Sequence, residues 1–155
     1  MDDHLNSRYE TDALIWTDTQ IALLRAGKFD QLDVENIISE LGYQVRKDKR
    51  EVATRIRRLL HQLLKYQFQP VRICNSWRQT IRTQRDQNDV VLKGMPSLRR
   101  MLDEYAEDAY PKAVRDAAEA THLPISAFPP TIPYTTDQLL DRSFYPGENE
   151  KAVEP

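Results

Sequence analysis

The stretch that decides the fold is DVENIISELGYQVRKDKREVATRIRRLLHQLLKYQFQP, residues 33–70. Its apolar side chains recur at spacings of three, four and seven residues, which is the period of an amphipathic α-helix. We expect this stripe to face the core; it consists of Val34, Ile38, Leu41, Val45, Val52, Ile56, Leu59 and Leu63. Asp33 is a favourable N-cap, and Pro70 ends the pattern. The spacing therefore predicts one helix of about 36 residues, roughly 54 Å long, in which Gly42 is the only weak point.

A shorter helix is predicted before this stretch, over about residues 12–26. Thr11 is expected to cap its start, and Gly27 lies just past its end, where a left-handed residue commonly stops a helix. One face of this helix is lined by Leu14, Thr17, Ile21 and Leu24 and widened by Trp16, Gln20 and Leu23. We expect that face to point inward.

Two more helices are predicted after Pro70. Ser76 with Gln79 three residues later has the pattern of a capping box, so a helix is expected to begin there and to end near Gly94. Ser97 is expected to cap the next helix. Pro111 then kinks that helix or restarts it, because proline lacks the amide proton that a helix interior needs.

The C-terminal part changes character at LPISAFPPTIPY, residues 123–134. It holds four prolines but also five large apolar residues, so we expect an extended segment that wraps over the helices. Thr135 and Gln138 form a second capping box before a short helix. Together these patterns predict an all-α chain, a bundle of about four to six helices built on a long antiparallel helix hairpin. The single helical domain is expected to cover residues 9–146, and residues 147–155 are expected to be a disordered tail.

Composition limits the class of protein. The chain has 155 residues, of which 40% are hydrophobic and 30% charged, which is typical of a soluble globular domain. No apolar run is long enough to cross a membrane, and the N-terminal stretch MDDHLNSRYE lacks an apolar signal core. We therefore expect a cytoplasmic protein. Cys74 is the single cysteine, so an internal disulfide and a cysteine-cluster metal site are excluded; no metal or cofactor is expected.

Charge is unevenly distributed along the chain. Residues 46–85 contain twelve Lys and Arg but only two acidic residues, whereas the other 115 residues contain ten basic and twenty-two acidic residues. Such segregation is typical either of a surface for a polyanionic partner or of basic elements that pair internally with acidic ones. Both interpretations stay open at this point.

The long helix places many of these cations on one side. We call this set the basic stripe: Arg46, Lys47, Arg50, Arg57, Arg58, His61 and Lys65. On a helical wheel it lies opposite the apolar stripe and therefore faces solvent or a partner. It could follow nucleic-acid phosphates, although no aromatic residue interleaves with it and no nucleic-acid-binding motif is present.

A second candidate site begins at NSWRQTIRTQR, residues 75–85. We call it the polar cluster: Trp77, Arg78, Arg82, Gln84, Arg85 and Asn88. Gln84 and Asn88 interrupt an otherwise apolar helix face, and amides that point inward must be hydrogen-bonded. One interpretation is a buried network in which acidic side chains meet the arginines. The other is a polar pocket above Trp77 that binds an anion or an extended peptide.

Signals for catalysis are few. The histidines are far apart in the sequence, and no Gly-rich phosphate loop is present. Arg55 and His61 resemble the Arg–His pair of the helical HEPN ribonucleases, except that Ile56 follows the arginine. This leaves one enzymatic alternative, a metal-independent ribonuclease-like hydrolase that uses His61 with Arg55 or Arg57.

Several strings resemble, in order, the bacterial domain of unknown function 29 family. They are YETDALIWTDTQIALLRAGKFDQLDVENIISEL, LLHQLLKYQFQP, SWRQTIRTQR, AYPKAV and LPISAFPPTIPYTTDQLLD. The resemblance implies an all-helical bacterial domain and supplies no activity. The positions that match the family's most characteristic string are Ser76, Trp77, Arg78, Thr80, Ile81, Gln84 and Arg85.

From these patterns we expect a non-enzymatic binding or interaction domain with its basic segment as the contact surface. A protein partner is favoured over nucleic acid, no membrane contact is expected, and a homo-oligomer is compatible with the sequence.

Overall fold

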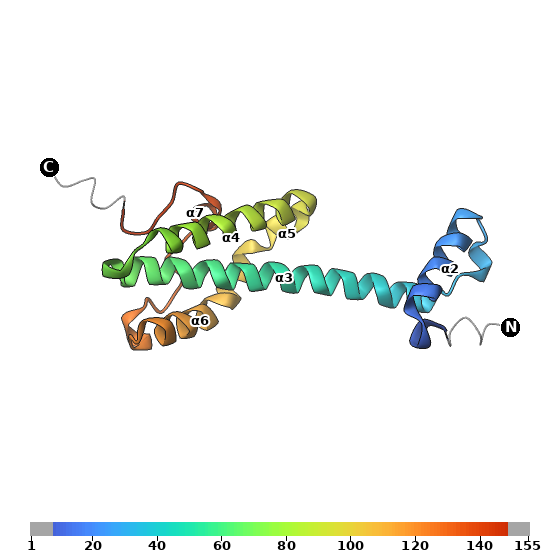
Figure 1. The fold of residues 1–155 in the computed structure, drawn as a ribbon, viewed down its shortest axis with the longest axis horizontal. Coiled ribbons are helices and arrows are strands. Elements are labelled where there is room, and N and C mark those ends of the chain that lie inside the picture. Colours follow the sequence, from blue (N-terminus) through green and yellow to red (C-terminus); the bar gives the residue numbers. More distant parts are fainter. Residues whose placement is uncertain (1–7, 149–155) are drawn as a thin grey trace. The chain divides into compact units, whose positions relative to one another are not determined.

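The computed structural model describes residues 8–148. Those residues form helices and no strand, so the predicted all-α fold is confirmed. The elements are α2 (Ala13–Arg25), η1 (Phe29–Gln31), α3 (Val34–Phe68), η2 (Pro70–Arg72), α4 (Asn75–Gly94), α5 (Pro96–Arg100), α6 (Leu102–Thr121), η3 (Ile125–Ala127) and α7 (Thr136–Leu140) (Figure 1). No helix in this part of the chain is both long enough and apolar enough to cross a membrane.

The chain divides into two compact units, residues 1–48 and residues 49–155. The first contains α2, η1 and the beginning of α3, and the second contains the rest of α3 and all later elements. The predicted single domain over residues 9–146 therefore stays a prediction. Gly147 and Glu148 lie in a turn, and the remainder of the predicted disordered tail, residues 149–155, lies outside the described residues.

Helix α3 is continuous over 35 residues, as the periodicity predicts, and Gly42 does not interrupt it. Its first turn is anchored by the amide of Ile37, which donates to the carbonyl of Asp33 over 3.0 Å. The apolar stripe, however, is buried along only part of its length. Val52, Ile56, Leu59 and Leu63 are buried, whereas Val34, Ile38, Leu41 and Val45 are exposed. The expectation that all eight face the core is wrong, because periodicity shows which face is apolar and not whether another element covers it.

The first unit is built around the contact between α2 and the start of α3. Asp12, and not Thr11, is the N-cap of α2, and its Oδ1 accepts from the amide of Ile15 over 3.1 Å. Gly27 follows the helix with φ +71°, so its predicted role at the helix end is confirmed.

The buried residues of α2 lie at the edge of the expected face and not at its centre. Trp16 is only 4% exposed and Gln20 only 3%, whereas Leu14, Ile21 and Leu24 of the predicted inward face are exposed. Hydrogen bonds select this face: the indole Nε1 of Trp16 donates to Oδ2 of Asp33 over 2.9 Å, and the amide of Asp33 donates to Oε1 of Gln20 over 2.9 Å. The expectation that Leu14, Ile21 and Leu24 point inward is therefore wrong, whereas Trp16 and Gln20, which widen that face, are buried.

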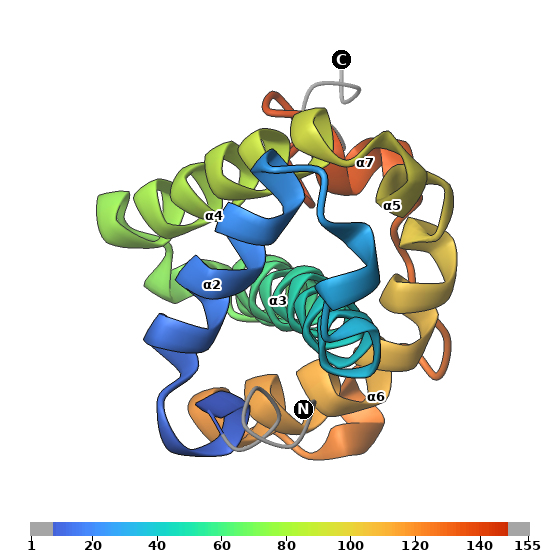
Figure 2. The ribbon, with the colours of Figure 1, turned by 90° about the vertical axis from the view of Figure 1, so that its right-hand side faces the viewer.

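The second unit contains the main core. Within it, α4 runs back antiparallel to the C-terminal part of α3, and α6 lies along another side of α3 (Figures 1 and 2). The predicted helix hairpin is therefore confirmed. The largest fully buried side chains of the second unit are Tyr66, Ile56, Leu59, Leu60, Leu63, Leu64, Ile81, Leu102, Leu139 and Val52.

Two helix boundaries in this unit differ from expectation. Helix α4 begins at Asn75 with Cys74 as N-cap and without a side-chain cap, so the capping box of Ser76 and Gln79 is wrong. The next helical stretch breaks at Met101, where α5 ends, and α6 then continues through Pro111 without a restart. Pro111 is exposed, so its ring lies on the solvent side of α6.

The Pro-rich segment wraps over the helices as predicted. Phe128 and Tyr134 are buried. The hydroxyl of Tyr110 donates to the carbonyl of Pro129 over 2.6 Å, and that of Tyr134 donates to Oε1 of Gln67 over 2.7 Å. The capping box that Thr135 forms at the start of α7 is confirmed. These contacts fix the C-terminal segment on α3 and α6.

Candidate functional site

A cavity of about 350 Å³ lies between α3 and α6 in the second unit. We call it the basic cavity. It is lined by Arg50, Ala53, Thr54 and Arg57 of α3 and by Tyr105, Asp108, Ala109 and Lys112 of α6. Residues spaced by three, four or seven share one helix face, so each helix turns one such row toward the other. Three cations and one carboxylate therefore surround a shared space.

Arg57 is held in place by α6. Its Nε donates to Oδ2 of Asp116 over 2.6 Å, and its Nη2 donates to Oδ1 over 2.8 Å. This two-point pairing fixes the plane of the guanidinium. The hydrogen bonds from Arg57 keep the pKa of Asp116 below its ordinary value, against an opposing effect of burial. Arg57 is thus a structural link between α3 and α6 as well as part of the cavity wall.

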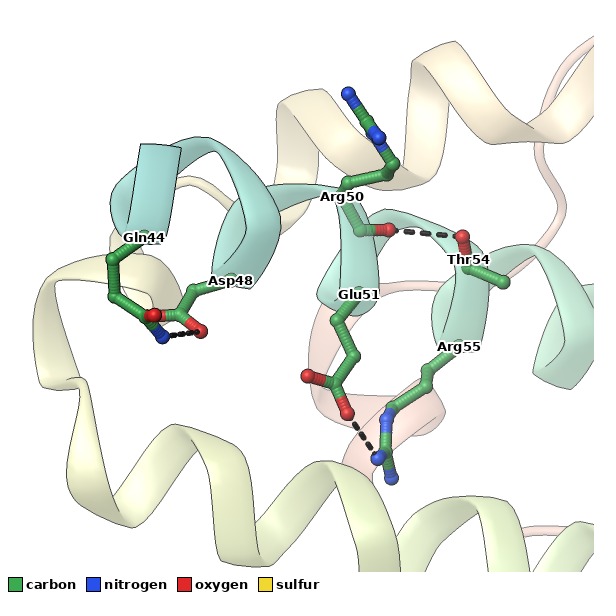
Figure 3. Close-up of polar contacts among 6 residues, drawn as sticks. All are labelled: Gln44, Asp48, Arg50, Glu51, Thr54 and Arg55. Atoms are coloured by element: carbon green, nitrogen blue, oxygen red, sulfur yellow. Dashed lines mark hydrogen bonds and ion pairs between the residues drawn. The ribbon is translucent and has the colours of Figure 1, made fainter. Parts of the chain in front are cut away.

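Arg50 and Lys112 are different, because neither side chain forms a hydrogen bond or ion pair with any residue of the described part of the chain. Figure 3 shows Arg50 extending to one side of α3, while Glu51 and Arg55 pair on the other side. Two cations without partners therefore line one cavity from opposite helices.

A hydroxyl group adds to this site. The hydroxyl oxygen of Tyr105 is buried and has no hydrogen-bond partner. A buried hydroxyl without a partner carries a desolvation cost that an incoming acceptor would remove. Asp108 is the one carboxylate in the lining, so the cavity wall has a net positive charge.

His61 lies one turn beyond Arg57 on α3. Burial lowers its pKa first of all, and the positive charges of Lys65 and Arg57 lower it further, while Asp116 opposes them. Its Nε2 is buried without a hydrogen-bond partner. Arg55, the other residue of the ribonuclease-like alternative, pairs with Glu51. Nothing in this arrangement supports the hydrolase alternative, which stays a prediction.

The remaining members of the basic stripe are not gathered in one place. Arg46 and Lys47 belong to the first unit and are exposed, and Arg58 is exposed in the second. Lys65 lies with its ammonium nitrogen 4.5 Å from the ring centroid of Trp77 on α4. The structure thus brings only Arg50 and Arg57 of the stripe into the basic cavity.

Arg85 of the polar cluster is a buried structural residue. It is 2% exposed, and its guanidinium donates to three backbone carbonyls: those of Gln138 over 3.1 Å, Leu139 over 3.0 Å and Phe144 over 2.7 Å. The expected carboxylate partner is therefore replaced by the end of α7 and the chain that follows it. Burial lowers the pKa of Arg85, yet an arginine keeps its charge in proteins.

The other members of the cluster divide between contact and solvent. Arg78 pairs with Glu148, the kind of carboxylate partner that was expected, and Glu148 also accepts from the hydroxyl of Tyr66. Arg82 is exposed. Asn88 is buried and Gln84 half-buried, and the amide nitrogen of Asn88 and the amide oxygen of Gln84 have no hydrogen-bond partner. No cavity described here is lined by these six residues.

Sequence reasoning missed the α6 side of the cavity. Asp108, Lys112 and Asp116 of that side were not considered. Their spacing of four residues is visible in the sequence, but the pairing of Arg57 with Asp116 joins residues 59 positions apart. Only the fold shows such a contact.

In the described part of the chain no three His, Cys, Asp or Glu residues are grouped so that they could hold a metal ion. The cavity instead offers two unpaired cations and a hydroxyl donor, which together suit a carboxylate or phosphate group.

The comparisons with curated proteins and with solved structures found no match. A family model described as "Domain of unknown function DUF29" matches residues 8–145. This span includes α2 to α7, both walls of the basic cavity and all of the polar cluster. The chain therefore belongs to the domain of unknown function 29 family.

Proposed function

We propose that this protein is a non-enzymatic binding domain that holds an acidic segment of a partner protein in the basic cavity. The observation that carries the proposal is the pair of unpartnered cations, Arg50 and Lys112, which face one space from two helices. An acidic side chain placed between them would neutralise both and could accept from the hydroxyl of Tyr105.

A protein ligand fits this surface better than nucleic acid does. Nucleic-acid affinity comes mainly from many phosphate contacts along an extended cationic surface. Here Arg57 is paired with Asp116, and Lys65 lies against Trp77. Arg50 and Lys112, the unpaired cations of the lining, face one cavity, whose size suits one or two carboxylates.

The test uses a labelled glutamate-rich peptide, an uncharged peptide of equal length and a single-stranded oligonucleotide, with binding followed by fluorescence anisotropy. We expect the acidic peptide to bind and the double variant Arg50→Gln/Lys112→Gln to bind roughly tenfold or more weakly, since two charge contacts are lost. Arg58→Gln is the matched control, because it removes an exposed cation of α3 outside the cavity and should leave binding intact.

Two results would overturn the proposal. One is a lack of binding to the acidic peptide at low salt. The other is tighter binding of the oligonucleotide with a steep loss of affinity as salt increases, which would assign the surface to nucleic acid.

A further inference from the structure

The first unit exposes an unusual amount of apolar surface. Of the thirteen large hydrophobic residues that are exposed in the described part of the chain, ten lie between residues 14 and 45: Leu14, Ile15, Ile21, Leu24, Phe29, Val34, Ile38, Leu41, Tyr43 and Val45. Isolated exposed apolar residues are normal, but a concentration of them in one small unit marks an interaction surface.

Four of these residues form a row on α3, which we call the seam: Val34, Ile38, Leu41 and Val45. Each is between 52% and 63% exposed. At 100° per residue all four point within about 60° of one direction, and the row is roughly 16 Å long at 1.5 Å per residue. Alternating spacings of four and three residues are the pattern by which one helix packs along another.

The flank of the seam carries complementary charges. Glu35 and Arg46 lie on the same side of the seam, about 90° and 110° from its centre on the helical wheel. Gly42 lies between them on that flank, and a methyl group there would be 3.2 Å from Nη1 of Arg46. The guanidinium therefore extends back along α3 over Gly42. A glycine inside a helix lowers helix stability, and here it leaves room for that side chain.

We propose that two copies of this chain pair antiparallel through the seam. A two-fold axis near residues 39 and 40 would place Val34 opposite Val45 of the second copy, and Ile38 opposite its Leu41. In an antiparallel helix pair the same flank of each helix faces its counterpart. Glu35 would then lie about 3 Å along the axis from the position of Arg46 in the second copy. In a parallel pair that flank would face the opposite flank of the second copy, so Glu35 and Arg46 would not meet.

The size of the seam sets the expected strength. Stable interfaces bury about 800 Å² per partner, and four half-exposed side chains on one helix supply only part of that area. The pairing is therefore a reversible association that depends on concentration, and not a permanent dimer.

Sedimentation or light scattering of the full chain over a concentration series measures the association. We expect the wild-type mass to rise toward twice that of one chain, and Ile38→Glu/Leu41→Glu to stay monomeric. Val90→Glu is the matched control, because Val90 is 74% exposed, more than any residue of the seam, but lies on α4. Circular dichroism should show equal helix content in all three. A monomeric wild type, or a dimer that survives the double change in the seam, would overturn the proposal.

Charge reversal tests the antiparallel arrangement separately. Glu35→Arg alone and Arg46→Glu alone should each weaken association roughly tenfold, because like charges then meet twice in each dimer. The two changes combined in one chain should restore it. A combined variant as weak as the single ones would refute the Glu35–Arg46 pairing and with it the proposed orientation.

Discussion

Replacing Arg85 by methionine tests whether the C-terminal segment is held in place by one buried cation. Methionine keeps most of the side-chain length but removes the charge and all five donors. The change leaves three carbonyls, those of Gln138, Leu139 and Phe144, without the donor that now satisfies them.

The expected magnitude follows from these contacts. A hydrogen bond to a charged group contributes about 1.5–3 kcal/mol, and three of them would exceed 4 kcal/mol if nothing opposed them. Two of the three are only partly buried, so those carbonyls can recover water. Removing the guanidinium also removes the desolvation cost of a buried charge, which is several kcal/mol. We therefore expect a net loss of roughly 2–4 kcal/mol in the free energy of unfolding, or about 5–15 °C in Tm for a chain of this size.

The assay is thermal and urea unfolding followed by circular dichroism, together with amide hydrogen exchange of residues 135–145. Arg82→Met is the matched control, since Arg82 lies on the same helix but is exposed. It should change stability by less than about 0.5 kcal/mol. Exchange should quicken first in α7 for Arg85→Met alone. Equal stability of the two variants, or unchanged exchange in α7, would refute the anchoring role of Arg85.

The remaining predictions concern pH and backbone conformation. Burial lowers the pKa of His61 in the folded state, so the unfolded chain binds more protons and stability falls as pH decreases through and below about 6.5. His61→Gln should flatten the Tm curve between about pH 8 and pH 5, and an unchanged slope would contradict this cause. The lowered pKa of Asp116 contributes stability above its unfolded pKa of about 3.9, which is lost as pH falls through the folded value. Asp116→Asn should therefore cost roughly 0.5–1 kcal/mol at neutral pH, because the pair with Arg57 is partly exposed, and a urea midpoint equal to that of the wild type would argue against it. Gly27→Ala should cost about 1 kcal/mol because Gly27 has a left-handed conformation, whereas Gly94→Ala, without positive φ, should not destabilise; urea unfolding that ranks the two in the opposite order would exclude this explanation.

The features that local sequence determines were predictable. The 35-residue helix α3 follows from periodicity and from Pro70, because each hydrogen bond and each apolar face repeats within a few residues. The capping box at Thr135 is equally local. The prolines and apolar residues between Leu123 and Tyr134 correctly indicated an extended segment that covers the core.

The features that depend on distant partners were not predictable. The apolar stripe of α3 is exposed from Val34 to Val45 and buried from Val52 onward. No pattern within the helix distinguishes those halves. The face of α2 was decided by hydrogen bonds to Asp33, and α6 passes through Pro111 because the ring lies on its exposed side. The candidate site could not be predicted for the same reason, because α6 contributes one half of the basic cavity.

The contacts of Arg85 with three carbonyls also determine when, during synthesis, its helix can complete its packing. Helix α4 leaves the ribosome more than forty residues before Phe144, so its arginine is made long before its acceptors exist. Until then the charge must stay hydrated, and the helix face that bears it cannot pack in its final form. We expect a chain that stops short of Phe144 to keep that face open. Chains truncated before Phe144 would therefore expose a surface that proteases and chaperones recognise.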